Sequence, residues 1–304
     1  MIRNYLASWL AAWDQFWFEP RTPETLSVMR MLVGSMLFYT HAIWTLELEA
    51  FLGNNNSALS TEFRQLFTSS TGWSWSHFDW SETNVWLWGT HSFALLVFAA
   101  FTLGLWTRIA SILAFLFVVS YANRATGALF GLDQINAFLT LYLAISNCGA
   151  TFSIDSLLDL RKGQGSENYS VANNVATRLI QVHLCIVYLF AGLGKIQGTT
   201  WWNGQAVWGT LASYEYQTLD LTELAHAMWL VNLMTYFTVF WEFSYSFLIW
   251  PKLTRPLFLA AAVVVHLGIG FSMGMMTFGL IMIYANLAFV PPNFFGFLIQ
   301  KETH

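Results

Sequence analysis

The chain is a series of long apolar runs separated by short polar stretches. The runs at 109–119 and 257–270 each contain a single polar side chain and do not alternate between apolar and polar positions. Lipid leaves only helices and closed barrels as membrane-spanning structures. A barrel would show alternating segments of about ten residues, whereas continuous apolar runs of about 20 residues indicate helices. The pattern therefore predicts an all-α, polytopic integral membrane protein, built as a helical bundle in the lipid bilayer.

Eight transmembrane helices are expected, of which the fourth and the eighth are short. They cover approximately residues 24–46, 83–106, 108–130, 132–148, 174–195, 228–250, 255–273 and 276–291. The links at 107 and 251–254 are so short that the helices they join must be antiparallel neighbours. Because no internal repeat is visible, we expect a single transmembrane domain over 1–304, with the bundle over 22–292 and a short cytoplasmic tail over 293–304.

Three tryptophan-rich segments fall outside the expected bundle. In residues 1–21, Trp9, Trp13 and Trp17 recur at a spacing of four, which predicts an amphipathic helix lying in the membrane interface. This segment lacks the basic start and long apolar run of a signal peptide. The polar loop 47–82 and the loop 198–227 carry further tryptophans and are expected at the outer face.

Composition agrees with the pattern and excludes other classes of protein. Hydrophobic residues make up 56% of the chain and charged residues 10%, against about 25% charged in soluble proteins. The 16 tryptophans suit a chain with many interfacial belts. Thirteen Lys and Arg against 17 Asp and Glu exclude a basic nucleic-acid binder, and two cysteines exclude a disulfide scaffold.

The basic residues also predict an orientation. An even number of helices places both termini on one side, which we take to be the cytoplasm. The inner segments then hold Arg3, Arg21, Arg108, Arg161, Lys162, Lys252, Arg255 and Lys301. The outer loops hold only Arg64 well clear of a span. This asymmetry follows the positive-inside rule.

Two ion pairs are expected among the charged side chains within the spans. Such groups are costly in lipid and normally face the bundle interior with a partner. Arg124 and Asp133 flank the short outer turn between two helices, and Arg30 and Glu242 lie at similar inner depth. Each pair would fix helix register, and removing Arg30 or Glu242 alone would leave an unpaired charge and lower the folding yield.

The outer half also receives His41, His91 and Lys195, none of which has an evident carboxylate partner. Gln181, Tyr188 and Lys195 recur at a spacing of seven and so share one helix face. A lysine removed from water can lose its proton and act as a base, although a lysine at a helix end can also snorkel to the surface.

Two glycines, Gly192 and Gly194, leave the backbone near Lys195 open to close approach by a helix or a ligand. His266 shares a face with Gly270 and Gly274, where it is either a packed core histidine or a ligand-pocket residue. Within the spans, no two His or carboxylate residues have the i,i+3 or i,i+4 spacing of a metal site, so no metal is expected.

Several stretches, in this order, resemble the HTTM (horizontally transferred transmembrane domain) family, which is related to vitamin K-dependent gamma-carboxylase. They are Arg30, Gly131-Leu-Asp133, Phe152-Ser-Ile-Asp155-Ser-Leu-Leu, Arg178-Leu-Ile-Gln181, Tyr188-Leu-Phe-Ala-Gly-Leu-Gly-Lys195, Trp202-Asn-Gly204-Gln-Ala, Trp241-Glu242, His266 and Met276-Thr-Phe-Gly-Leu-Ile-Met-Ile-Tyr284. The resemblance extends over about residues 22–292 and implies a bundle with a site that opens toward the outer face.

The resemblance also implies a role for Lys195. The carboxylase deprotonates reduced vitamin K with a lysine in an Ala-Gly-x-x-Lys stretch, which Ala191-Gly-Leu-Gly-Lys195 matches, followed by Trp202-Asn-Gly204. Lys195 would then take a proton from a reduced quinone or another lipidic ligand, which reacts with oxygen or another acceptor. The expected pocket residues are His41, His91, Gln181, Tyr188 and His266. The resemblance implies the cytoplasmic membrane of a bacterium as the location.

Two departures from the carboxylase argue against protein carboxylation. The chain ends within about a dozen residues of its last expected helix, without a propeptide-binding domain, and 132–147 contains no histidine. Two other functions stay open. The chain could be a non-catalytic membrane partner or maturation factor that binds another protein through its outer loops 47–82 and 198–227. It could also be a small-molecule transporter, although transporters usually show internal repeats.

Overall fold

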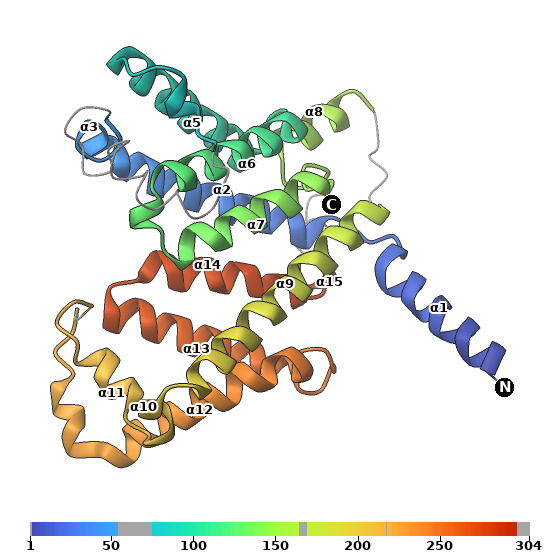
Figure 1. Cartoon of the computed structure of the whole chain (residues 1–304). Helices are drawn as coiled ribbons and strands as arrows, with labels where there is room; N and C mark the ends of the chain where they lie inside the picture. The colour runs from blue at the N-terminus through green and yellow to red at the C-terminus, as the bar shows by residue number, and fades with distance from the viewer. Residues whose placement is uncertain (1, 54–74, 164–168, 217, 297–304) are drawn as a thin grey trace. The chain divides into compact units, whose positions relative to one another are not determined.

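Helices provide nearly all the regular structure of the computed structural model, which describes residues 2–53, 75–163, 169–216 and 218–296 (Figure 1). Within these ranges, the one pairing of extended backbone is an antiparallel bridge between Arg21 and Ser170. The all-α fold expected from the hydropathy pattern is therefore confirmed.

Five helices of the described ranges are long and apolar enough to cross a membrane, and they identify the chain as an integral membrane protein. They are α2 (Glu24–Trp44, continued by a short 3₁₀ turn and α3, Leu48–Leu52), α5 (Asn84–Leu103), α9 (Val171–Ile196), α12 (Met228–Leu248, preceded by the 3₁₀ helix η4, Thr222–Ala227) and α13 (Arg255–Met273). This is fewer than the eight spans expected.

The remaining three expected spans are helical but shorter or more polar. They are α6 (Thr107–Arg124), α7 (Gly131–Ile145) and α14 (Met276–Asn286), of 18, 15 and 11 residues. At a rise of 1.5 Å per residue, α7 and α14 are about 22 and 16 Å long, which is less than a hydrocarbon layer of about 30 Å. The sequence pattern located these helices and overestimated their lengths, because apolar turns at their ends continue the apolar run.

Shorter helices occupy the segments outside the spans. They are α1 (Ile2–Phe18), α8 (Ile154–Arg161), α10 (Thr199–Trp202), α11 (Ala206–Leu211) and α15 (Asn293–Gly296). The N-terminal segment is thus helical as expected, and Trp9 and Trp13 stack with their ring centroids 5.7 Å apart. Most of the expected outer loop 47–82 lies outside the described residues.

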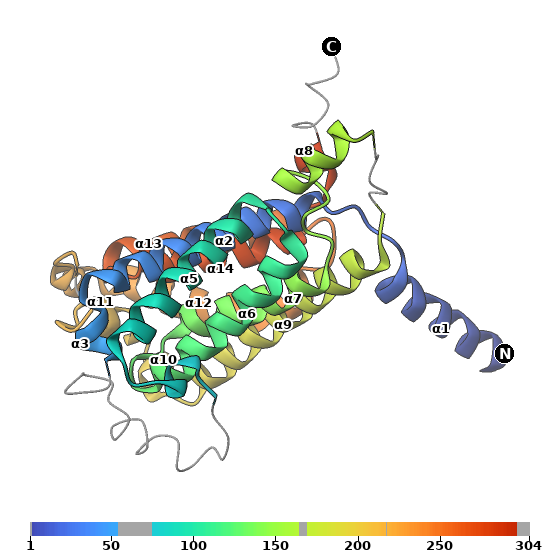
Figure 2. The same cartoon turned by 90° about the horizontal axis from the view of Figure 1, so that it is seen from above.

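The helices form two compact units, one of residues 1–178 and 290–304, the other of residues 179–289. In the first unit α2 packs against α5, and α6 packs against both α5 and α7 (Figure 2). In the second unit α13 packs against α12 and α14. The expected neighbours on either side of the two shortest links, α5 with α6 and α12 with α13, are therefore in contact. The single transmembrane domain stays a prediction.

The guanidinium of Arg30 is fully buried and binds backbone carbonyls in the first unit, so the expected Arg30–Glu242 ion pair is wrong. Its Nη1 donates to the carbonyls of Phe101 and Thr102, both at 2.7 Å, and Nε donates to that of Cys148 at 3.1 Å. Nη2 donates to the carbonyl of Phe152. Carbonyls at helix ends lack intrahelical partners and carry partial negative charge, so together they replace a carboxylate.

Asp155 of α8 binds the backbone next to the carbonyls that Arg30 contacts, at the junction between α5 and α6. Its carboxylate accepts the backbone N–H groups of Trp106 and Thr107, at 2.9 and 2.7 Å, and so caps the start of α6. Gly104 adopts a left-handed φ of 68° here, and a Cβ on it would lie 2.6 Å from Nη1 of Arg30. The residues of this junction that resemble the HTTM family therefore hold helix ends together.

The expected Arg124–Asp133 ion pair is also wrong, because both side chains form hydrogen bonds with backbone groups instead. Arg124 donates to the carbonyls of Leu52 and Gly53 at the end of α3, at 2.9 and 3.0 Å. Asp133 accepts the backbone N–H of Phe130 at 3.0 Å and so caps α7. Short connections leave unsatisfied N–H and C=O groups at helix ends, and these groups are closer partners than the next helix's side chain.

Replacing Arg30 with Lys tests the carbonyl cluster. An ammonium cannot reach four carbonyls on separate chain segments, so the variant should lose about 3 kcal/mol of unfolding free energy or more. Thermal unfolding of the detergent-solubilised protein measures the loss. Arg161→Lys on the exposed side of α8 is the control and should be neutral; an equally neutral Arg30→Lys would contradict the role given to the cluster.

His77 predicts a dependence of stability on pH. It lies in the short helix η2 (His77–Trp80), outside the spans, with its Nδ1 and backbone N–H on the Ser120 hydroxyl. Burial, aided by the neighbouring His91, lowers the pKa of His77 from 6.5 to about 4. Unfolded His77 therefore takes up a proton at a higher pH than folded His77, and acid favours unfolding. About 2 kcal/mol should be lost between pH 7 and pH 5.

Thermal unfolding of the wild type and of His77→Phe at the two pH values tests this. The difference between the two proteins isolates His77 from other titrating groups. Stability should fall less steeply toward pH 5 in His77→Phe, and parallel losses in both proteins would assign the acid sensitivity elsewhere.

Candidate functional site

Lys195 and Glu242 form an ion pair in the second unit, between the end of α9 and the middle of α12. The ammonium lies 2.7 Å from Oε2 and 2.9 Å from Oε1 of the carboxylate, with the two side chains 25% and 11% exposed. The expectation that Lys195 lacks a carboxylate partner is therefore wrong. It rested on helix depths counted along the sequence, which placed Glu242 in the inner half and Lys195 in the outer half. Helices that are staggered or tilted bring such residues to one level.

At Gly192 the backbones of α9 and α12 approach each other closely. A Cβ on Gly192 would lie 3.0 Å from the backbone nitrogen of Phe243 and 3.3 Å from its Cα. A Cβ on Gly194 would meet no described atom within 4 Å. Of the two glycines near the lysine, Gly192 is thus the one that allows the backbones to touch, one turn before Lys195 and one residue from Glu242.

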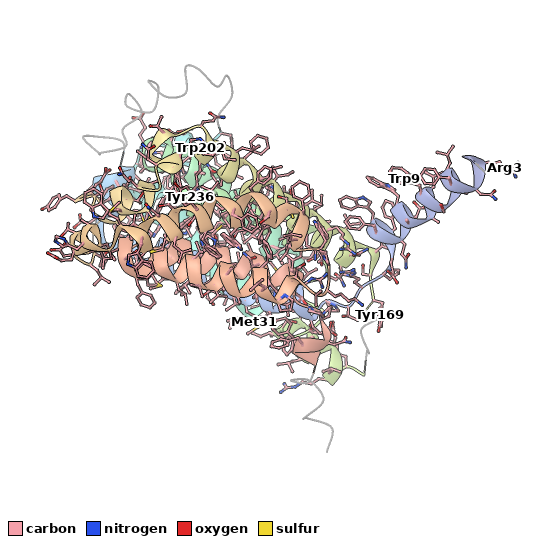
Figure 3. All side chains as sticks on the ribbon, turned by 90° about the horizontal axis from the view of Figure 1, so that it is seen from below. Arg3, Trp9, Met31, Tyr169, Trp202 and Tyr236 are labelled. Atoms are coloured by element: carbon pink, nitrogen blue, oxygen red, sulfur yellow. The ribbon has the colours of Figure 1, made fainter. Side chains whose placement is uncertain are left out.

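An apolar hollow lies beside the ion pair. It has a volume of about 250 Å³ and is lined by Ile196, Trp201, Trp202, Tyr236, Val239, Phe240 and Phe243. Two of these residues, Trp202 and Tyr236, are labelled in Figure 3. The Lys195 ammonium lies 5.3 Å from the ring centroid of Trp201. Tyr236 donates to the carbonyl of Trp202, and the indole of Trp202 to that of Ile196, at 2.8 and 2.6 Å. The Tyr236 hydroxyl and the Trp202 indole of the lining are therefore bound to backbone carbonyls, and the lining is largely apolar.

The turn after α10 completes this wall. Gly204 has a φ of 74°, and a Cβ on it would lie 2.6 Å from the Asn232 side chain of α12. A residue with a side chain would thus be strained and would push the α10–α11 segment off α12. The Trp202-Asn-Gly204 stretch of the resemblance is therefore needed to shape the wall of the hollow.

A chain of hydrogen bonds links four buried side chains of the second unit. Tyr245 donates to the Asn286 carbonyl at 2.6 Å, the Asn286 amide donates to the Tyr188 hydroxyl at 3.1 Å, and that hydroxyl lies 2.7 Å from Nε2 of His266. Which of the two groups donates in the Tyr188–His266 contact depends on whether the imidazole carries its hydrogen on Nε2 or on Nδ1. Neither this Nδ1 nor the indole nitrogen of Trp241 has a hydrogen-bond partner among the described residues.

Of the expected pocket residues, the structure brings Tyr188 and His266 together in this chain. Sequence reasoning missed Asn286 and Tyr245, although a lone amide in the apolar run 276–289 signals a buried polar contact. The Gln181 amide donates to the carbonyl of Ala288 at 2.7 Å, which ties α9 to the end of the α14 region.

The histidines His41 and His91 belong to the first unit, where each has a partner. His91 lies 2.6 Å from the Tyr121 hydroxyl and 2.9 Å from that of Thr45, and His41 lies 2.8 Å from the carbonyl of Leu37. Within the described ranges, no three His, Cys, Asp or Glu side chains gather in a way that could hold a metal ion.

The two glycines of α9 provide a matched test of the close approach. Gly192→Ala should separate α9 from α12 and lower the melting temperature of the purified protein, because its methyl group has too little room. Gly194→Ala should be neutral or stabilising by up to about 1 kcal/mol, since it faces open space and alanine favours a helix. Equal melting temperatures for the two variants would show that Gly192 does not set the helix contact.

Comparison with known proteins agrees with the resemblance seen in the sequence. The family model described as the HTTM domain matches residues 18–294, nearly the whole chain. No curated protein matches the chain, and no solved structure matches it. With its apolar spanning helices, this chain is a membrane protein that belongs to the HTTM family.

Proposed function

We propose that the second unit binds a lipidic ligand with an ionisable hydroxyl, such as a reduced quinone, and that Lys195 removes the hydroxyl proton. The observation that carries this proposal is the position of the Lys195–Glu242 pair beside an apolar hollow. A hydroxyl placed next to the pair would have an apolar tail that needs such a hollow. The eight-span bundle with both termini in the cytoplasm belongs to the same proposal, with the shorter helices completing the crossings.

The shape of the hollow favours a ligand that enters from the bilayer. Its volume of about 250 Å³ is slightly below the 300–1,000 Å³ typical of ligand pockets. Trp202 and Phe240 on its rim are 64% and 65% exposed. An exposed apolar side chain on a spanning helix, such as Phe240 on α12, faces acyl chains. A lipid tail or isoprenoid chain therefore fits the lining, whereas a polar metabolite would find few groups to bind.

The ion pair suits a base that must first lose its own proton. In the proposed reaction Glu242, which contacts the ammonium directly, takes the lysine proton. The free amine then accepts the proton of the ligand hydroxyl. The resulting ammonium stays next to the ligand anion and stabilises it.

The base is tested with a short-chain naphthoquinol as the probe, which oxygen oxidises to the quinone with hydrogen peroxide as the other product. Deprotonation accelerates this reaction, so the wild type should increase the rate of quinone formation. Lys195→Met should reduce the protein-dependent rate by about 100-fold or more. Lys162→Met, at an exposed lysine, is the control. A Lys195→Met protein that folds and keeps the wild-type rate would contradict the proposal.

Filling the hollow tests ligand binding apart from the base. Val239→Trp places an indole in the hollow, whereas Leu233→Trp places one on the exposed face of the same helix. Lipids that copurify with each protein are extracted and quantified by mass spectrometry. A lipid species bound by the wild type and by Leu233→Trp should be lost from Val239→Trp. Identical lipid profiles for all three proteins would remove the hollow as a binding site.

A further inference from the structure

The N-terminal helix α1 carries an apolar face that no other described element covers. Tyr5, Leu6, Trp9, Leu10 and Trp13 are each between 49% and 68% exposed. At about 100° per residue they lie on one side of the helix, and Asn4, Ser8, Ala11 and Gln15 lie on the other. Trp9 is labelled in Figure 3, with Arg3 near the far end of the helix. A contiguous exposed apolar face of this kind marks a surface that contacts lipid or another protein.

The C-terminal end of α1 is tied to the start of α9. The carbonyl of Phe16 accepts from the Asn174 amide at 2.9 Å and from Nε of Arg178 at 3.0 Å. The Arg178 guanidinium also lies 4.1 Å from the Phe16 ring centroid. This clamp, formed by Asn174, Arg178 and Phe16, joins α1 to a spanning helix.

The linker between α1 and α2 also contacts the start of α9. Arg21 and Ser170 exchange two backbone hydrogen bonds of 3.1 and 3.0 Å, and Ser170 immediately precedes α9. Since α2 begins at Glu24, α1 leaves the protein where two spanning helices start. Those helix ends mark a face of the bilayer, and the 17 residues of α1 give the helix a length of about 26 Å.

We propose that α1 lies flat in the bilayer interface at the face where α2 and α9 begin, with its tryptophan side in the acyl-chain boundary and its polar side toward water. The partner in this proposal is the lipid surface. Because α1 is attached at the membrane face, lipid lies beside it in whichever direction it extends along that face. Tryptophan prefers this boundary, where its ring is apolar and its N–H remains hydrated. The clamp holds the helix in this plane. The inference does not depend on the ligand or on Lys195.

Fluorescent labels on opposite sides of α1 test the proposal. Leu6→Cys and Ser8→Cys lie about 160° apart around the helix, and each is labelled with nitrobenzoxadiazole in the full-length protein. Cys148 and Cys185 are buried, and the parent protein controls for their labelling. The proteins are reconstituted into phosphatidylcholine vesicles with or without a lipid that carries a spin-label quencher on its acyl chain. The label at position 6 should lose more than half of its emission, and that at position 8 should lose little.

Equal quenching at the two positions would overturn the proposal. So would a label at position 6 that the lipid quencher cannot reach, which is the result expected if a second copy of the chain covers this face. The clamp has its own test. Arg178→Met should leave the label at position 6 quenched but lower its fluorescence anisotropy, because the helix is no longer held at its end. Unchanged anisotropy, with Lys162→Met as the control, would remove the clamp.

Discussion

Polar groups that leave water must find partners inside the protein, and this requirement organises both units of the structure. In a helical membrane protein the backbone satisfies itself along each helix, so the problem is concentrated at helix ends and at the few charged side chains. The buried guanidinium of Arg30 and the carbonyls at several helix ends are each other's partners, because Arg30 donates hydrogen bonds to those carbonyls. The charges of Lys195 and Glu242 are instead compensated by each other in an ion pair. Each arrangement holds together segments far apart in the sequence.

The Arg30 cluster and the Lys195–Glu242 pair differ in whether their polar groups are bound to the backbone. The donors of Arg30 are occupied by backbone carbonyls, and Asp155 is occupied by backbone N–H groups. Because these hydrogen bonds join helix ends, we assign Arg30 and Asp155 a structural role. In the described part of the chain, the Lys195–Glu242 pair is held by contacts between the two side chains, is partly accessible, and adjoins an apolar hollow. The proposed proton transfer is placed at this pair because neither of its side chains is used to cap a helix end.

Close backbone approach is the second condition for the site. Gly192 lets α9 touch α12, and Gly204 lets the following turn lie on the same helix. Without them the lysine would not reach the carboxylate and the aromatic wall would open. The family resemblance contains both the chemical and the structural residues, and the sequence does not separate them. Only the contacts show that Arg30 and Asp155 serve helix junctions while Lys195 lies next to a cavity.

The apolar runs by themselves determined that this is an all-α membrane protein, roughly where its helices lie, and that α1 has one aromatic side. These features depend on local periodicity and on the preference of side chains for lipid, which a sequence states directly. The partners of the charged groups were decided only by the tertiary structure, and both expected ion pairs were wrong. Depth counted along a helix ignores stagger and tilt, and it omits backbone carbonyls as partners. Which polar group meets which is therefore set by packing, since a shift of a few ångströms between helices exchanges one partner for another.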